Sequence, residues 1–339
     1  MTLAAVQSDA CAPDLSDQAF VAADIGGTHA RLGLVAAEKG GLGFKVLAYQ
    51  TYKCAQWASL TAILQEFIKA EVRAPVSHCV LAIAGVPIDG HLVTENLPWP
   101  VSTHELRRAL GLHDIAIVND FFALATAVRS IGDEVEATLT EARSPTHAGP
   151  RVVVGPGTGL GAAVLVPHAP KPLVLSTEAG QVALAPRTAT EREVLALLAR
   201  GDRHVSSESI LSGPGLYTLY RSLATLHGVT PRHVRPNQIT DAARSGEDPL
   251  ASEAVHTFCA WLGSYVGDLA MMFNAGGGVY LAGGVLAHLS DILPQTAFVE
   301  RFLDKGSLRA FLEKVPVHLI DHGRLGVIGA ADWYFGRGA

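Results

Sequence analysis

The sequence predicts an α/β protein built from two related halves, and three observations support this. The chain has 339 residues, enough for two domains at roughly 150 residues each. Two short apolar segments, residues 20–25 and 152–154, each run into a glycine-rich turn and then into a second apolar segment. Each pair is followed by alternating strand and helix patterns, the order typical of an α/β fold. The repeat is architectural, because it lacks the short period of a solenoid.

The predicted elements follow from residue pattern. In the first half, apolar segments and helical spacing predict strands 20–25, 30–36, 44–50, 79–84 and 115–118 and helices 57–72, 102–110 and 121–128. In the second half they predict strands 152–154, 162–166, 279–282 and 317–320, helices 191–199, 215–226 and 252–273, and a terminal helix from residue 326. Residues 1–19 have neither the basic start nor the apolar core of a signal peptide, so we expect a flexible lead-in.

Composition and charge exclude several classes of protein. Hydrophobic residues make up 49% and charged residues 17% of the chain, which excludes intrinsic disorder. A net charge of −6 argues against a nucleic-acid or anionic-membrane surface. Residues 269–290 carry no formal charge, but their glycines divide them into a helix end, a strand and a turn rather than a membrane span. The four cysteines lack C-x-x-C and zinc spacing, which indicates reduced thiols of a cytoplasmic protein.

The two glycine-rich turns, residues 24–28 and 155–161, predict phosphate binding. Without a Cβ, backbone N–H groups can approach an anion closely. In the first turn, Asp24 adds a carboxylate that can hold a water bound to Mg²⁺, and Thr28 adds a hydroxyl near the phosphoryl oxygens. Taken singly, each turn is explained equally well as a tight hairpin.

Two other nucleotide-binding motifs do not account for these turns. The P-loop pattern G-x-x-x-x-G-K-[ST] is absent. Residues 157–162 satisfy G-x-G-x-x-A, and Glu178 follows about 20 residues later, as in the dinucleotide-binding fingerprint. That fingerprint needs a helix at the glycines, whereas here a short apolar segment ends at Pro167. We therefore predict a strand at this point and reject the dinucleotide site.

Polar side chains at segment ends form a second group of candidates. Asn119 and Asp120 close a buried strand and open an apolar helix, where either could simply be a helix cap. The functional alternative is a general base at Asp120, with Asn119 orienting the substrate. Glu178 and Glu208 are either solvated acids or carboxylates that accept hydrogen bonds from neighbouring sugar hydroxyls. Asn96 is a turn residue or a member of the same sugar site.

Together these segments resemble the bacterial glucokinase family. The resemblance runs in order from about residue 20 to 335 through DIGGTHARLGL (24–34), NLPWPVS (96–102), IVNDFFALATA (117–127), VVVGPGTGLGAAVLV (152–166), STEAGQVALAP (176–186), VSSESILSGPGLYTLYR (205–221), VYLAGGVL (279–286) and VPVHLIDHGRLGVIGA (315–330). The resemblance implies a two-domain actin-like, ribonuclease H-like ATPase fold with an interdomain active-site cleft. It divides the chain into a smaller domain, 20–121 plus 326–339, and a larger domain, 122–325.

The resemblance also implies a cytoplasmic, homodimeric enzyme that phosphorylates glucose with ATP and Mg²⁺, feeding glycolysis, with neither nucleic acid nor membrane as a partner. Asp120 matches the family's catalytic base. The sugar-binding positions match Asn96, Asn119, Asp120, Glu178, Gln181 and Glu208. The phosphate and adenosine positions match Asp24 (which also holds Mg²⁺ through water), Gly26, Gly27, Thr28, Gly155, Gly157, Thr158, Gly159, Gly283 and Gly284.

Two departures from the family pattern bear on specificity. Gln181 stands where the family usually has a sugar-binding histidine, and His29 stands where asparagine is usual. A glutamine still hydrogen-bonds a hydroxyl but carries no charge. The cysteine-rich zinc motif of the related repressor and kinase group is absent. Two other functions stay open: a catalytically weak sensor of hexose and nucleotide, and an ATPase switch that hydrolyses ATP without sugar.

Overall fold

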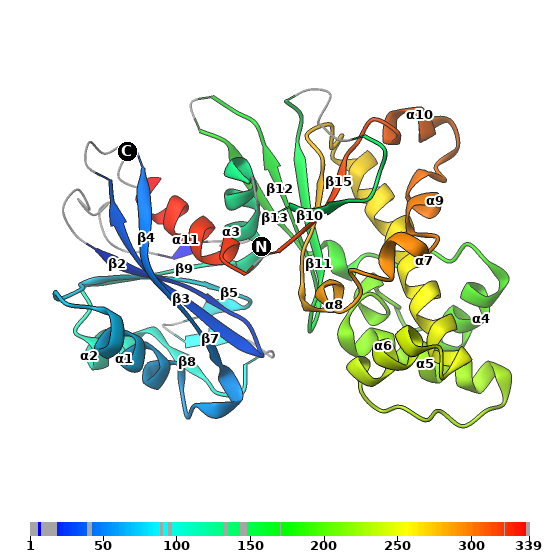
Figure 1. Ribbon diagram of the computed structural model, residues 1–339, viewed down its shortest axis with the longest axis horizontal. Helices are drawn as coiled ribbons and strands as arrows, with labels where there is room; N and C mark the ends of the chain where they lie inside the picture. Colours follow the sequence, from blue (N-terminus) through cyan, green and yellow to red (C-terminus); the bar gives the residue numbers. More distant parts are fainter. Residues whose placement is uncertain are drawn as a thin grey trace. The chain divides into compact units, whose positions relative to one another are not determined.

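The computed structural model describes residues 6–7, 19–38, 43–88, 91–93, 97–131, 135–142, 148–169, 171–321 and 323–336. Its contacts divide the chain into two compact units (Figure 1). The first unit comprises Met1–Ile131 and His322–Ala339, and the second unit comprises Gly132–Asp321.

The first unit contains a six-stranded mixed sheet in the order β1-β9-β5-β2-β3-β4. The central strands β9, β5 and β2 are parallel, and the other pairs are antiparallel. The strands are β1 (Val6–Gln7), β2 (Phe20–Ile25), β3 (His29–Ala37), β4 (Phe44–Lys53), β5 (His78–Ile83) and β9 (Asp114–Val118). A smaller antiparallel sheet holds β6 (Val86–Ile88), β7 (His91–Val93) and β8 (Val101–Ser102).

Helices cover both faces of the first sheet, because successive side chains of a strand point to opposite faces. Val21 and Ala23 of β2 belong to the apolar cluster shared with α1 and α2. Phe20 and Ala22 belong to the cluster shared with α3 and α11. Figure 1 shows the two helix pairs on opposite sides of this sheet. The helices are α1 (Leu60–Glu71), α2 (Thr103–Leu110), α3 (Asp120–Ala127) and α11 (Leu325–Phe335), with the 3₁₀ turns η1 (Cys54–Gln56) and η2 (Val128–Ser130).

The second unit repeats the same strand pattern. Its sheet order is β10-β15-β14-β11-β12-β13, again with three central parallel strands and antiparallel outer pairs. The strands are β10 (Val135–Thr138), β11 (Arg151–Pro156), β12 (Leu160–Val166), β13 (Leu173–Thr177), β14 (Val279–Leu281) and β15 (Val317–Ile320). The two related α/β halves predicted from the sequence are therefore confirmed. The antiparallel edge strands β1 and β10 extend the repeat beyond the prediction.

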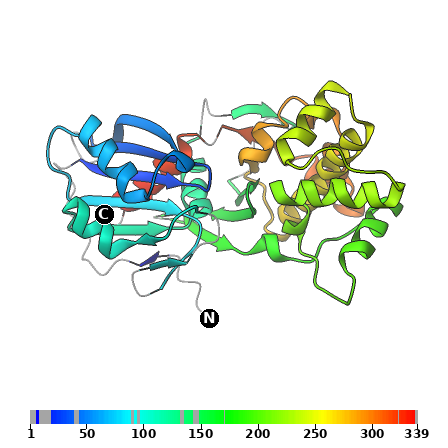
Figure 2. The ribbon, with the colours of Figure 1, turned by 90° about the horizontal axis from the view of Figure 1, so that it is seen from below.

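Helices of the second unit pack around one long helix, α7 (Pro249–Met272). Figures 1 and 2 show α5, α6 and α9 gathered against it. Its Phe258 and Trp261 are buried in the unit's main apolar cluster. The other helices are α4 (Ala189–Leu198), α5 (Gly213–His227), α6 (Pro236–Ser245), α8 (Gly284–Ala287), α9 (Phe298–Leu303) and α10 (Arg309–Leu312), with 3₁₀ turns η3 (Ala179–Gln181), η4 (Ser207–Ser209), η5 (Leu293–Gln295) and η6 (Gly306–Leu308).

Several sequence-based boundaries differ from the structure. The predicted domain boundary after residue 121 falls inside α3, which packs on α11 and belongs to the first unit. The contact is close, since a Cβ at Gly329 would lie 1.8 Å from the carbonyl oxygen of Ala123. Within the lead-in expected to be flexible, Val6–Gln7 pairs with β9. Helix α1 starts at Leu60 rather than residue 57, because the Ser59 side chain caps it.

The charge-free segment 269–290 is divided as predicted into the end of α7, strand β14 and a turn leading to α8. In the part of the chain that the structure describes, no helix is long and apolar enough to cross a membrane. Cys54, Cys79 and Cys259 are buried free thiols, and Cys11 lies outside the described residues.

Candidate active site

Strand register brings the candidate residues of the first unit to one sheet edge. Asp24 pairs with Ala82 on β5, and Ala82 pairs with Val118 on β9. Neighbouring strands lie about 4.8 Å apart, so Asp24 and Val118 are separated by roughly 10 Å. The first glycine turn follows Asp24, and Asn119 and Asp120 follow Val118. These segments therefore leave the sheet at the carboxyl ends of its parallel strands, where α/β proteins bind ligands.

The first glycine turn is held by backbone hydrogen bonds. The Gly26 N–H donates to the His29 carbonyl over 3.0 Å, and the Cys54 N–H donates to the Thr28 carbonyl over 2.9 Å. The Cys54 Sγ also donates to the Gly26 carbonyl over 3.3 Å. The Thr28 side chain is exposed beside this framework. Burial and the positive charges of Arg31 and Lys53 lower the pKa of His29.

Asp24 lies at the end of β2 and is 8% exposed. Burial raises the pKa of Asp24, against the opposing effect of Arg31, whose Nη1 donates to its Oδ2 over 3.2 Å. A Cβ at Gly326 would lie 2.6 Å from the Asp24 Cγ, so the first turn of α11 approaches this carboxylate through glycine. Sequence reasoning missed Arg31, although the hairpin register places it directly opposite Asp24.

Asn119 and Asp120 share the start of α3. The Asn119 Oδ1 accepts a hydrogen bond from the Phe122 N–H over 3.0 Å, which confirms the cap interpretation for this residue. Asp120 is the first helical residue, and its Oδ1 accepts from the Phe121 N–H over 3.0 Å. Its half-buried carboxylate gains stabilisation from the positive end of the helix dipole. Asn96 lies outside the described residues.

In the second unit the end of β11 and the glycine segment after β14 lie backbone against backbone. A Cβ at Gly155 would lie 2.4 Å from the Ala282 carbonyl oxygen. A Cβ at Gly283, which has φ of 105°, would lie 2.5 Å from the Pro156 carbonyl oxygen. The structure thus brings these two predicted ligand segments together, and close approach explains both glycines.

Two other glycines have no such packing reason. Within the described part of the chain, a Cβ on Gly157 or on Gly284 would meet nothing within 4 Å. Gly157 sits in the turn itself, where its N–H donates to the Gly159 carbonyl over 2.8 Å and its carbonyl accepts from the Gly213 N–H over 2.8 Å. The space beside these two backbones is what a bound phosphate needs. Thr158, between Gly157 and Gly159, is exposed.

Glu208 of η4 joins the predicted sugar group to the second glycine turn. Its Oε2 accepts a hydrogen bond from the Leu160 N–H over 2.7 Å, and its Oε1 accepts from the Gln181 Nε2 over 3.0 Å. A Cβ at Gly159 would lie 2.5 Å from the same Oε2. Sequence reasoning did not identify the Leu160 N–H, because backbone donors leave no signature in side-chain pattern.

Glu178 precedes η3 and Gln181 is its last residue, and η3 packs on β12. The Gln181 N–H donates to the Glu178 carbonyl over 2.9 Å, and a Cβ at Gly180 would lie 2.2 Å from the Leu160 carbonyl oxygen. Both side chains are exposed. The segment 178–181 and the Glu208 carboxylate therefore both approach Leu160, beside the second glycine turn. Strand β12 continues from this turn, which confirms that the dinucleotide fingerprint was correctly rejected.

The repeated sheet, with a glycine turn joining β2 to β3 in one half and β11 to β12 in the other, defines a two-domain actin-like α/β fold. A family model described as Glucokinase matches residues 21–335, and the chain belongs to the glucokinase family.

Individual relatives agree with this assignment. A glucokinase-like protein of Xylella fastidiosa strain 9a5c is 47% identical over 324 residues, covering 94% of this chain and 96% of its own. A glucokinase of Saccharophagus degradans is 39% identical over 318 residues, covering 93% and 97%. The crystal structure of a glucokinase from an Antarctic psychrotroph superposes with a TM-score of 0.79 at 33% identity, covering 94% of this chain and 99% of the other.

Proposed function

We propose that this protein transfers the γ-phosphoryl group of ATP to the 6-hydroxyl of glucose, giving glucose 6-phosphate and ADP. The observation that carries the proposal is the 2.7 Å hydrogen bond between the Leu160 N–H and the Glu208 carboxylate. It puts a carboxylate suited to sugar hydroxyls directly against a glycine turn suited to phosphates. Membership of the glucokinase family supports the same assignment.

The sugar is held by side chains that both donate and accept. The carboxylates of Glu178 and Glu208 accept from hydroxyls, and each oxygen keeps further acceptor capacity beyond its present bonds. Gln181 offers an amide that donates to Glu208 and accepts from a hydroxyl. In the first unit, the Asn119 Oδ1 caps α3, which leaves its amide nitrogen to donate to the substrate. Asn96 joins this set from its family match.

Asp120 is the proposed general base. Its carboxylate takes the proton of the sugar 6-hydroxyl while that oxygen attacks the γ-phosphorus in line with the departing ADP oxygen. Glycine-turn N–H groups stabilise the charge on the transferring phosphoryl group.

The residues fit ATP and its Mg²⁺. The backbones at Gly157 and Gly284 have open space beside them, as a phosphate and its nucleoside require. Among the described residues no group of three or more His, Cys, Asp and Glu could hold a metal ion. Mg²⁺ carried by ATP needs only one or two carboxylates besides phosphates and water. Asp24 would hold the ion through a water molecule, and a cation held there would offset the negative charge of the phosphates.

We also propose a pathway, a cellular compartment and an oligomeric state for this enzyme. A kinase of this kind supplies glucose 6-phosphate to glycolysis in the cytoplasm, and the family resemblance implies a homodimer. Sedimentation velocity of the purified full-length chain at several concentrations tests the dimer. A single monomeric species at all concentrations would contradict it.

A coupled assay with ATP, Mg²⁺ and a panel of hexoses tests the activity. Sugar phosphate formed from glucose, identified by mass spectrometry, supports the kinase. Saturable glucose binding without turnover would indicate the sensor instead. ATP hydrolysis at the same rate with and without sugar would indicate an ATPase switch. Repeating the panel with ADP or polyphosphate in place of ATP identifies the phosphoryl donor.

A further inference from the structure

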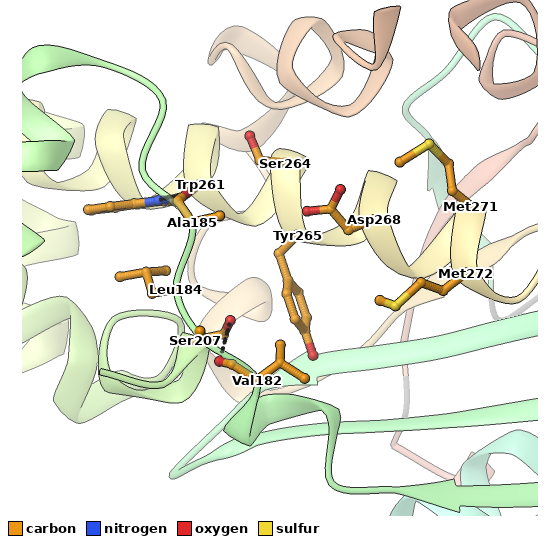
Figure 3. Close-up of a pocket in the computed structure, with 11 residues that line it drawn as sticks. Val182, Leu184, Ala185, Ser207, Trp261, Ser264, Tyr265, Asp268, Met271 and Met272 are labelled. Carbon is orange, nitrogen blue, oxygen red and sulfur yellow. Dashed lines mark hydrogen bonds between the residues drawn. The ribbon is translucent and has the colours of Figure 1, made fainter. Parts of the chain in front are cut away.

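A pocket of about 330 Å³ lies in the second unit between one face of α7 and the extended segment Val182–Ala185. On α7 its lining repeats at helical spacing: Trp261, Ser264, Tyr265, Asp268, Met271 and Met272. Figure 3 shows the Trp261 side chain beside Ala185 and the Tyr265 ring extending from α7 toward Val182. A volume of this size and a mainly apolar wall are typical of small-molecule sites. None of the predicted site residues lines this pocket.

Tyr265 contributes a polar group that the protein itself does not satisfy. The residue is 6% exposed, and its hydroxyl has no hydrogen-bond partner among the described residues. The ring points from α7 toward Val182 (Figure 3). Burial and the negative charge of Glu208 raise the pKa of Tyr265, so the hydroxyl keeps its proton at neutral pH. A buried hydroxyl without a partner is costly, and a ligand with an acceptor oxygen would relieve that cost.

The other polar lining groups are already engaged. The Ser207 Oγ donates to the Val182 carbonyl, and the Ser264 Oγ accepts from Arg301. Asp268 is paired with the Lys305 Nζ at 2.5 Å. An anionic ligand would meet the carboxylate of Asp268, and a cation would find that carboxylate already neutralised. The lining therefore suits an uncharged molecule.

The wall of the pocket is continuous with the proposed sugar site. The Ser207 N–H donates to the Val182 carbonyl over 2.8 Å, and the Leu184 N–H donates to the Val205 carbonyl over 2.9 Å. Val182 follows Gln181 in the chain, and Ser207 precedes Glu208. The two paired segments that line the pocket thus carry the two residues joined by the Gln181–Glu208 hydrogen bond.

We propose that this pocket is an effector site for a small, uncharged, mainly apolar molecule with one acceptor oxygen. The oxygen accepts a hydrogen bond from the Tyr265 hydroxyl, and binding of the molecule alters glucose binding through the Gln181–Glu208 pair. The effect on glucose rests on the proposed function. Binding to Tyr265 does not depend on it.

Two matched probes test the site by ¹⁹F NMR on the full-length protein. The first is 4-fluoroacetophenone, which has a carbonyl oxygen, and the second is 1-ethyl-4-fluorobenzene, which lacks it. We expect saturable binding of the ketone, tighter than the hydrocarbon by roughly 2- to 12-fold, the value of one hydrogen bond. Tyr265→Phe should abolish this preference. Tyr217→Phe, the same change on α5 outside the pocket lining, should keep it.

Titration calorimetry with glucose tests the coupling. Saturating ketone should change the glucose Kd by roughly twofold or more, and saturating glucose should change the ketone Kd by the same factor, because coupling is reciprocal.

Absence of saturable ketone binding, or a preference for the ketone that survives Tyr265→Phe, would overturn the proposal. An unchanged glucose Kd would also overturn it. So would ketone binding that disappears at concentrations where the chain dimerises, because a second copy would then cover the pocket. A protein that binds ketone through Tyr265 but never binds glucose would instead refute the proposed function.

Discussion

The Gln181 Nε2 donates a 3.0 Å hydrogen bond to the Glu208 Oε1, joining two residues 27 positions apart in the chain. The other carboxylate oxygen of Glu208 accepts from the Leu160 N–H of the glycine turn. Gln181 and the second glycine turn therefore bind the same carboxylate. A neutral amide keeps this link independent of pH near neutrality.

Gln181→His should make glucose binding depend on pH. Imidazole titrates near pH 6.5, and the negative charge of Glu208 would favour the protonated imidazolium. The imidazolium would then compete with sugar hydroxyls for the carboxylate. We expect glucose affinity of the variant to fall by roughly threefold or more between pH 7.5 and 5.5. Titration calorimetry of both proteins over this range checks it, and parallel profiles for the two would refute it.

Asp120→Asn should remove the proposed general base. The kcat for glucose should fall by roughly 10²- to 10⁴-fold, the usual contribution of such a base. Glucose should still bind, because an amide occupies nearly the same volume. Asp202→Asn is the matched control, since Asp202 is exposed and has φ of 58°, a conformation that asparagine tolerates. Near-normal kcat in Asp120→Asn would show that the base is another group.

Two glycines of the second turn should respond differently to alanine. Gly155→Ala would force a methyl group against the Ala282 carbonyl oxygen, 2.4 Å away, so the free energy of unfolding should fall by roughly 1–3 kcal/mol or more. Gly157→Ala meets no protein atom and should change stability by less than about 0.5 kcal/mol. Its KM for ATP should rise about tenfold, equivalent to about 1.4 kcal/mol. Denaturant titration measures the free energy of unfolding of each variant, and initial rates measure the KM for ATP. An unchanged KM in Gly157→Ala would exclude ligand contact at Gly157.

Arg301→Met should destabilise the second unit. Arg301 donates to both oxygens of Glu191, at 2.6 and 3.1 Å, and both side chains are buried. Removing one partner of a buried pair leaves an uncompensated charge, which costs about 3–5 kcal/mol. Arg309→Met is the control, because it breaks the exposed pair with Glu313 and should cost about 0.5 kcal/mol or less. Similar losses in the two variants, measured by urea unfolding, would contradict the prediction.

His318 should make stability depend on pH on the acid side. Burial lowers the pKa of His318 below its ordinary value of 6.5, so the unfolded chain binds a proton that the folded chain does not. Stability should therefore fall as pH drops below about 6.5. His318→Gln should reduce that slope by up to about 1.4 kcal/mol per pH unit. Unfolding curves at pH 7.5, 6.5 and 5.5 measure this, and equal slopes would refute it.

Much of the fold could be predicted from the sequence because its signals are local. Strand β2, the turn after it and the cap at Asn119 were predicted from neighbouring residues alone. Helix α6 was missed, since Ile239 is the one large apolar residue in this otherwise polar segment. Strand β1 was missed because two residues carry no periodicity, and only pairing with β9 makes them a strand.

The two related halves, the glycine turns and the candidate acids could all be predicted from the amino-acid sequence. Residue type and short-range spacing are local properties, so these predictions needed no tertiary contact. The tertiary structure was needed to show that Glu208 accepts from the Leu160 N–H and that Gly155 lies against Ala282. It also shows that the buried Tyr265 hydroxyl has no partner among the residues that the structure describes. These contacts join residues far apart in the chain. They arise only when strands pair in register and helices bury their apolar faces together.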